Sequence, residues 1–301
     1  MSRNTARPSQ ILVTTDFSGN ASCAFPYASS LAKIHGSQLT ILHVVTGHSE
    51  YLPDNEIIKS YEQVIRKEAL ARLAGLEIPG QNGIRVRREI TSAWSAKDGI
   101  LEFAAAVKPD LIVMSTHGHR LAARLILGSV ARSVIAAAPC PVLCVKCARE
   151  GMVVDRQGVI RIARILVPID LSEESRLALN LAVAFVKTYD AQLHLMYVVH
   201  IDVPPALITD GTSQNFEVDE VMHSRISMRL QEFQREVDPG IEKVVTMVEK
   251  GSPAKRIAHY ADSQAIDLII VSRRGLGKTS HSLGCVAGRL LREAQCPTLV
   301  I

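Results

Sequence analysis

Two kinds of hydrophobic pattern alternate along the first half of this chain. Short apolar runs have the length and composition of buried strands, whereas the segments between them carry apolar residues at helical spacing. The predicted strands are residues 10–14, 38–45, 85–89, 111–114 and 142–145. The predicted helices are residues 21–35, 56–76, 97–107 and 121–137. Strands that alternate with helices are typical of an α/β fold whose parallel sheet is covered on both faces.

The second half of the chain repeats the first. Four segments recur in order: ILVTTDFS at 11–18 as ILVPIDLS at 165–172, HVV at 43–45 as YVV at 197–199, DLIVMSTHG at 110–118 as DLIIVSRRG at 267–275, and CPVL at 140–143 as CPTL at 296–299. Two copies, each about half of the chain, indicate two like domains rather than a solenoid of many short repeats. We therefore predict domains at 1–147 and 162–301, joined by a linker at 148–161 that carries glycines and charges.

Composition and charge narrow the class of protein. The chain has 301 residues, 47% of them hydrophobic, which suits a two-domain globular protein. Its formal net charge is only +4 and its basic residues are spread along the chain, so we expect no nucleic-acid partner. No apolar run reaches the roughly 18 residues that span a bilayer, and the start is polar, so we expect a cytoplasmic protein without a membrane partner.

The six cysteines do not outline a metal site. Cys140, Cys144 and Cys147 are close in sequence, but no second pair of ligands accompanies them. Four of the six cysteines lie in apolar runs, and thiols stay reduced in the cytosol, so we expect free thiols and no metal.

The most informative segment is the predicted strand at 111–114 with the loop and helix that follow it. A loop that leads from a strand into a helix leaves backbone N–H groups without partners, and such groups hold anions. Gly118 and Gly128 permit close approach of the backbone, and Ser129 adds a hydroxyl. Phosphate is the anion that this arrangement favours, although the glycines can serve packing and Ser129 can cap the helix.

This segment resembles the nucleotide loop of ATP-binding universal stress proteins, which is written G-x-x-G, nine residues, G-[S/T]. Ser115–Gly118, nine residues and then Gly128-Ser129 match it except at the first glycine, which is Ser115 here. Three further segments fit the same family in order: ILVTTDFS at 11–18, LHV at 42–44 and APCPVL at 138–143. The resemblance implies that each half is an open, five-stranded, Rossmann-like sheet of the adenine nucleotide alpha hydrolase-like type.

The resemblance also implies that the first half binds ATP, either alone or together with Mg²⁺. Asp16 is expected to contact the nucleoside, although it can also cap the next helix, and Val44 offers backbone groups to the base. The expected binding residues are Thr14, Thr15, Asp16, Val44, Met114, Ser115, Gly118, His119, Arg120, Gly128, Ser129 and Val130. If the site needs a positive φ at position 115, serine has a conformational energy cost there that glycine does not have.

A second site is expected to be weaker. Its loop is one residue shorter than the motif, which should displace the phosphate donors, and Cys285 replaces the serine or threonine. A thiol is a poor hydrogen-bond donor. The corresponding residues are Pro168, Ile169, Asp170, Val198, Val271, Ser272, Gly275, Gly284, Cys285 and Val286.

The function implied by the resemblance is ATP binding by a sensor or regulatory module of the stress response. Two alternatives stay open: a scaffold that needs no nucleotide, and a slow ATPase or related enzyme, for which no catalytic residue stands out. In the family, last strands pair across a two-fold axis, so residues 298–301 are expected to meet residues 142–145 and pair the two domains. A homodimer of the whole chain also stays open.

Overall fold

The computed structural model of the chain describes residues 7–46, 56–116, 127–147, 159–200, 220–275 and 283–301. It divides into two compact units. The first consists of Met1–Arg161, Ser280–Leu283 and Pro297–Ile301, and the second of Ile162–Thr279 and Gly284–Cys296. Among the helices of the described residues, none is long and apolar enough to cross a membrane.

The first unit is built on a parallel sheet whose strand order is β3-β2-β1-β4-β5. Its strands are β1 (Gln10–Thr14), β2 (Gln38–Thr46), β3 (Arg85–Ala93), β4 (Leu111–Ser115) and β5 (Val142–Val145). Strand β10 (Thr298–Val300) lies antiparallel to β5, with Leu299 opposite Leu143. The order of strands reverses between β1 and β4, which is where ligands bind in open α/β sheets.

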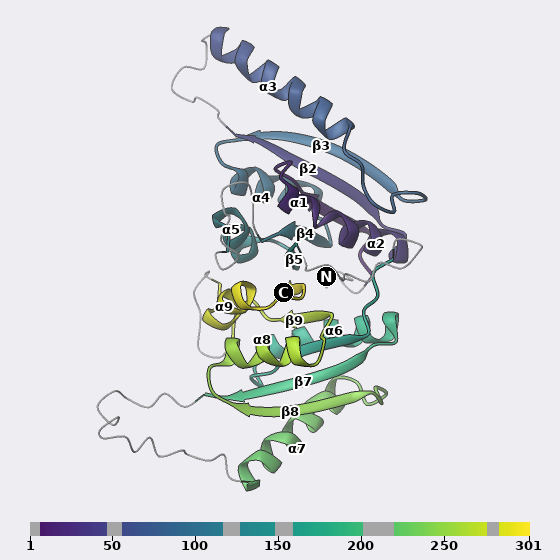
Figure 1. Cartoon of the computed structure of the whole chain (residues 1–301), viewed down its shortest axis with the longest axis vertical. Helices are drawn as coiled ribbons and strands as arrows, with labels where there is room; N and C mark the ends of the chain where they lie inside the picture. Colours follow the sequence, from purple (N-terminus) through teal and green to yellow (C-terminus); the bar gives the residue numbers. More distant parts are fainter. Residues whose placement is uncertain (1–6, 47–55, 117–126, 148–158, 201–219, 276–282) are drawn as a thin grey trace, which may run out of the picture. The chain divides into compact units, whose positions relative to one another are not determined.

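Five helices of the described part of the chain cover this sheet. They are α1 (Gly19–Ser22), α2 (Phe25–His35), α3 (Glu56–Ala74), α4 (Ala96–Val107) and α5 (Ser129–Ala137). Helices α4 and α5 pack against each other and lie side by side in Figure 1. Because the crossovers of parallel sheets are right-handed, α4 and α5 share one face and α2 and α3 cover the other.

The predicted single helix at 21–35 is wrong, because the segment forms two helices. Pro26 lies in the first turn of α2 and has no backbone N–H to donate to the preceding turn. The prediction that β3 ends at residue 89 is also wrong, since β3 stays paired with β2 as far as Ala93 opposite Thr46. Helix α5 begins at Ser129, and the predicted start at residue 121 falls outside the described residues.

The second unit repeats the plan, with strand order β9-β6-β7-β8. Its strands are β6 (Arg164–Pro168), β7 (Gln192–Val199), β8 (Val244–Lys250) and β9 (Leu268–Val271). Its helices are α6 (Glu173–Tyr189), α7 (Glu220–Val237), α8 (Pro253–Ser263) and α9 (Cys285–Glu293). Asn180 occupies the position in the second unit that Pro26 occupies in the first, ten residues after Asp170 and Asp16 respectively. Because asparagine has a backbone N–H to donate, α6 is continuous where the first unit has α1 and α2.

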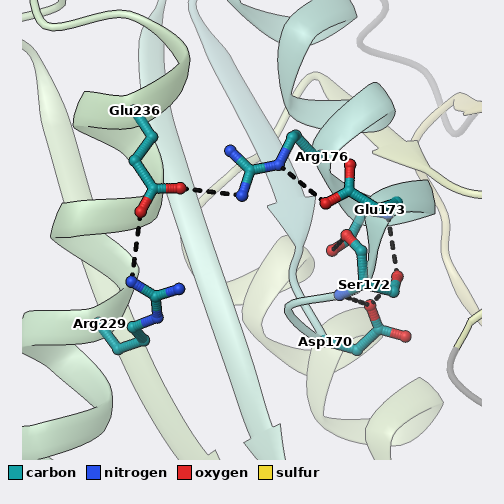
Figure 2. Close-up of polar contacts among 7 residues, drawn as sticks. Asp170, Ser172, Glu173, Arg176, Arg229 and Glu236 are labelled. Atoms are coloured by element: carbon teal, nitrogen blue, oxygen red, sulfur yellow. Dashed lines mark hydrogen bonds and ion pairs between the residues drawn. The ribbon is translucent and has the colours of Figure 1, made fainter.

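Charged side chains join α6 to α7 on the surface of the second unit. Figure 2 shows Arg176 of α6 reaching Glu236 of α7, with 2.8 Å between Nη2 and Oε2. Arg229 Nη1 lies 3.3 Å from the other oxygen of Glu236. The guanidinium of Arg176 also covers the ring of Phe233 at 4.5 Å. The salt bridges are exposed to solvent, so the packing of Phe233, which is almost fully buried, is the larger contribution to this contact.

Candidate functional site

A cavity of about 360 Å³ opens at the carboxyl ends of β1, β2 and β4, a size that suits a small-molecule ligand. The predicted residues that line it are Thr14, Thr15, Asp16, Val44, Met114, Ser115, Gly128, Ser129 and Val130. Gly118, His119 and Arg120 lie outside the described residues. Every predicted residue of the first site that the structure describes therefore borders one cavity.

The turn after β1 holds Asp16 in place. Asp16 Oδ1 accepts a hydrogen bond from the backbone N–H of Ser18 at 2.9 Å. Ser18 in turn is the N-cap of α1, since its hydroxyl accepts from the N–H of Ala21 at 3.1 Å. The helix cap is thus Ser18, and Asp16 organises the turn that leads into it. Phe17 between them has a positive φ of 61°, which places the chain in a tight turn.

His43 forms part of the same wall. Its Nδ1 lies 2.9 Å from the carbonyl oxygen of Thr15, and because a carbonyl can only accept, Nδ1 carries the proton. Burial is the main cause that lowers the pKa of His43, and Arg72 adds to the effect against the opposing influence of Thr15 and Asp16. The ring is therefore neutral near pH 7. Phe17 packs on it with 4.3 Å between ring centroids.

The loop between β4 and α5 is closed at its base by one backbone hydrogen bond. The N–H of Gly128 donates to the carbonyl of Thr116 at 2.9 Å, and a Cβ on residue 128 would lie 3.2 Å from that oxygen. Gly128 is the N-cap of α5 and has used its own N–H, so the donors that the first turn leaves for a ligand are those of Ser129, Val130 and Ala131. All three residues line the cavity.

Ser115 fits where the motif has glycine. It is the last residue of β4, and it pairs in register with Val145 of β5. Its backbone is extended like that of the strand, so serine carries no penalty for a positive φ there. The conformational cost of a positive φ, which we considered for serine at this position, is therefore absent.

A second cavity of about 380 Å³ occupies the equivalent place in the second unit. All the predicted residues of the second site line it: Pro168, Ile169, Asp170, Val198, Val271, Ser272, Gly275, Gly284, Cys285 and Val286. The carboxylate of Asp170 lies against the loop after β9, because a Cβ on Gly275 would come within 2.5 Å of Asp170 Oδ2. Residue 275 must therefore be glycine unless Asp170 moves.

The shorter loop of the second unit closes in the same way as the first. The N–H of Gly284 donates to the carbonyl of Arg273 at 2.9 Å, and a Cβ on Gly284 would lie 3.0 Å from that oxygen. The loss of one residue therefore leaves the hydrogen bond at the base of the loop unchanged. The expected displacement of the phosphate donors stays a prediction, because residues 276–282 lie outside the described residues. What differs is the chemistry, since Cys285 begins α9 and the buried Nε of Arg274 has no hydrogen-bond partner among the residues that the structure describes.

Comparison with known proteins gives the family. The model of the universal stress protein family matches residues 9–146 and again residues 161–301. The chain belongs to the universal stress protein family. A universal stress protein of Thermus aquaticus is 34% identical over 138 residues, which are 45% of this chain and 97% of the relative. That relative is thus as long as one of the two copies.

Two solved structures resemble this universal stress protein over nearly its whole length. A universal stress protein from Archaeoglobus fulgidus DSM 4304 has a TM-score of 0.62 at 22% identity, covering 97% of this chain and 95% of that one. A protein described as functionally unknown from Pseudomonas aeruginosa PAO1 has a TM-score of 0.66 at 19% identity, covering 100% and 94%. Both likenesses show the fold, and they confirm the predicted tandem α/β architecture.

Sequence patterns missed part of the first cavity wall of this universal stress protein. The additional lining residues are Ala21, Leu42, His43, Ala96, Ile100, Thr116 and Ala131. Ala96 and Ile100 belong to α4, which approaches β2 closely because Gly99 has no side chain. A Cβ on Gly99 would lie 2.6 Å from Val44 Cγ1. The sequence signal that points to this part of the wall is Ser95, the N-cap residue of α4. Its hydroxyl accepts a hydrogen bond from the N–H of Asp98.

The cysteines depart from the sequence-based expectation. Cys23 and Cys147 form a disulfide with their Cα atoms 5.2 Å apart, so the prediction of reduced thiols is wrong for this pair. Cys140 and Cys144 are buried and lie outside this disulfide, and burial raises the pKa of the Cys144 thiol. Within the described residues, no group of three or more His, Cys, Asp or Glu side chains could hold a metal ion.

Proposed function

We propose that this universal stress protein binds ATP in the cavity of its first unit and acts as a sensor or regulatory module of the stress response. The observation that carries the proposal is the convergence of Asp16, Val44 and the N-terminus of α5 on one cavity at the switch point of the sheet. A negatively charged phosphate is stabilised by the first-turn N–H groups of a helix and by the helix dipole.

The lining residues divide into groups that suit the parts of a nucleotide. Leu42, Val44 and Ile100 supply an apolar wall for a base. Asp16 supplies a carboxylate, which accepts hydrogen bonds from ribose hydroxyls. Ser129 begins α5 and supplies a hydroxyl beside the N–H groups that would hold phosphate. Among the described lining residues of this cavity, Asp16 is the one acidic side chain, and Mg²⁺ on nucleotides commonly needs only one or two carboxylates beside the phosphates.

The second cavity takes a lesser part in this proposal. Its volume of about 380 Å³ is close to the 360 Å³ of the first, but the thiol of Cys285 replaces the hydroxyl of Ser129, so we expect weaker nucleotide binding there. The proposal also keeps the domains at 1–147 and 162–301, their intramolecular pairing through β5 and β10, and a cytoplasmic location. The antiparallel pairing of Leu299 with Leu143 supports the domain pairing.

Native mass spectrometry of the full chain, followed by titration calorimetry with ATP and with GTP, tests the proposal. We expect one ATP per chain at high affinity, with GTP bound more weakly. A stoichiometry of two equal sites would mean that the thiol of Cys285 does not weaken the second site. No ATP carried from purification, and no heat on titration with or without Mg²⁺, would overturn ATP binding and favour the nucleotide-independent scaffold.

A further inference from the structure

The disulfide between Cys23 and Cys147 joins two walls of the first cavity. Cys23 is the C-cap residue of α1, whose Ala21 lines the cavity. Cys147 lies two residues beyond β5, after Val145, whose carbonyl accepts from the N–H of Thr116 at 3.0 Å. Thr116 also lines the cavity. Cys23 is therefore two residues from the lining residue Ala21, and Cys147 is two residues from Val145, which is hydrogen-bonded to the lining residue Thr116.

Helix α1 is short and packs on β4. It contains four residues, and a single helical turn is unstable in isolation. Its other fixed points include the cap at its start, where the Ser18 hydroxyl accepts from the N–H of Ala21, and the packing of buried Ala21. A disulfide at its C-terminal end is therefore a further restraint on this short wall, because local opening depends on the contacts that hold the segment.

The pair is placed to exchange between two states. Cys147 is exposed and Cys23 is half-buried, so a reductant can reach the bond. The two sulfur atoms lie 3.5 and 3.7 Å from the carbonyl oxygen of Gly19, which gives each thiol an acceptor after reduction. Cytosolic disulfides are in most cases redox-active rather than permanent, which fits the cytoplasmic location proposed above.

We propose that Cys23 and Cys147 form a redox-sensitive clasp that controls ligand affinity at the first cavity. A dithiol reductant attacks the exposed bond, the S–S bond breaks, two thiols form on the protein, and the reductant leaves as its own disulfide. Two electrons and two protons are transferred. When the disulfide is formed, α1 is already ordered before the ligand binds. When the disulfide is broken, ligand binding must also order α1, so the first cavity has a lower affinity for the ligand.

The second unit serves as an internal control. Leu177 stands five residues after the N-cap Ser172, as Cys23 stands five residues after Ser18. Helix α6 is also continuous there, with 17 residues rather than four, so its first turn does not depend on a covalent tie. Reduction is therefore expected to act on the first cavity and to leave the corresponding segment of the second unchanged.

The first experiment needs no nucleotide, so it stands apart from the proposed function on which the clasp rests. Peptide mapping without reductant should recover the Cys23–Cys147 linkage. Hydrogen–deuterium exchange of the apo protein should then be faster at residues 17–24 after dithiothreitol, and unchanged at residues 171–178. Absence of the linked peptide, or equal exchange at 17–24 in both states, would overturn the clasp.

The second experiment tests its effect on the ligand. Calorimetry should give an ATP dissociation constant about three- to ten-fold weaker after reduction, the size expected for ordering a short segment. The double variant Cys23→Ser, Cys147→Ser should bind with the reduced affinity and no longer respond to dithiothreitol. Equal ATP affinity in both redox states, with exchange at 17–24 altered, would overturn the control of affinity. Faster exchange at 17–24 with no ATP binding in either state would support the clasp and refute the proposed function instead.

Discussion

The backbone N–H of Gly128 donates to the carbonyl of Thr116, and the N–H of Gly284 donates to the carbonyl of Arg273, each at 2.9 Å. The two loops differ by one residue, yet each closes through the same pair of backbone groups. The helix that follows, α5 or α9, therefore starts immediately beside the strand that precedes the loop. Since both helices point their first turn at a cavity, this closure is the shared basis of the two sites.

Gly128→Asp should abolish nucleotide binding at the first cavity without unfolding the protein. The residue has φ of −58°, which any amino acid adopts, but its carboxylate would face the phosphates at the start of α5. Like charges in contact cost several kcal/mol, so we expect affinity to fall at least about a hundred-fold by calorimetry. Gly284→Asp is the matched change in the second unit and should leave the first site intact. Unchanged affinity in Gly128→Asp, with the folded circular dichroism spectrum retained, would refute the assignment of the loop.

Asp16→Ala should weaken ATP binding more than Asp170→Ala does. The alanine loses both the carboxylate and the hydrogen bond that Oδ1 accepts from Ser18, which organises the start of α1. Asp16→Asn keeps an oxygen acceptor for that N–H and loses only the charge. We expect about ten-fold weaker binding for alanine and a smaller loss for asparagine, in line with one charged hydrogen bond. A larger effect from Asp170→Ala would move the working site to the second unit.

Local patterns located the strands of the first unit and the positions at their carboxyl ends, except that β3 extends to Ala93 beyond its predicted end at residue 89. Asp16, Val44 and Ser115 follow or end apolar runs, and parallel strands bring such ends to one edge of the sheet. The sequence also contains the signal for the break between α1 and α2, because Pro26 has no backbone N–H to donate. That error came from giving hydrophobic spacing more weight than the rule for proline inside a helix.

Contacts between distant segments could not be predicted in this way. Ile100 reaches the cavity because the crossover after β3 carries α4 to the other face, where Gly99 lets it approach Val44. Cys23 and Cys147 are separated by 124 residues, and cysteine spacing alone does not specify pairing. Both features depend on the order of the strands, which hydrophobic periodicity does not encode.

Acid should destabilise the protein below about pH 6.5 through three buried or half-buried histidines. Burial lowers the pKa of His35, His43 and His194 from the ordinary value of 6.5. The unfolded chain then binds more protons than the folded chain as pH falls through 6.5, so stability is full above that pH and declines below it. Urea unfolding at pH 7.5 and 5.5 should show the loss.

The histidine contribution can be separated from that of the carboxylates. Hydrogen bonds from Arg176 and Lys187 lower the pKa of Glu236 and Asp238 from ordinary values of 4.5 and 3.8, so their stabilisation is lost only at lower pH. His194→Gln should therefore flatten the change between pH 7.5 and 5.5 and leave the change below pH 4.5 intact. An unaltered slope between pH 7.5 and 5.5 in this variant would exclude His194 as a cause.

Gly99→Val should reduce both stability and ATP affinity, because the cavity depends on the close contact of α4 with β2. A Cβ at this position would lie 2.6 Å from Val44 Cγ1 and 3.0 Å from Ala93 Cβ, so the helix or the strand must shift. Overpacking of this kind costs about 1–3 kcal/mol of unfolding free energy, measured by urea denaturation. Gly75→Ala is the control, since its new Cβ would meet its nearest neighbour at an ordinary 3.6 Å. A valine variant that loses stability but binds ATP with the original affinity would show that Val44 and Ile100 do not form the wall for the base.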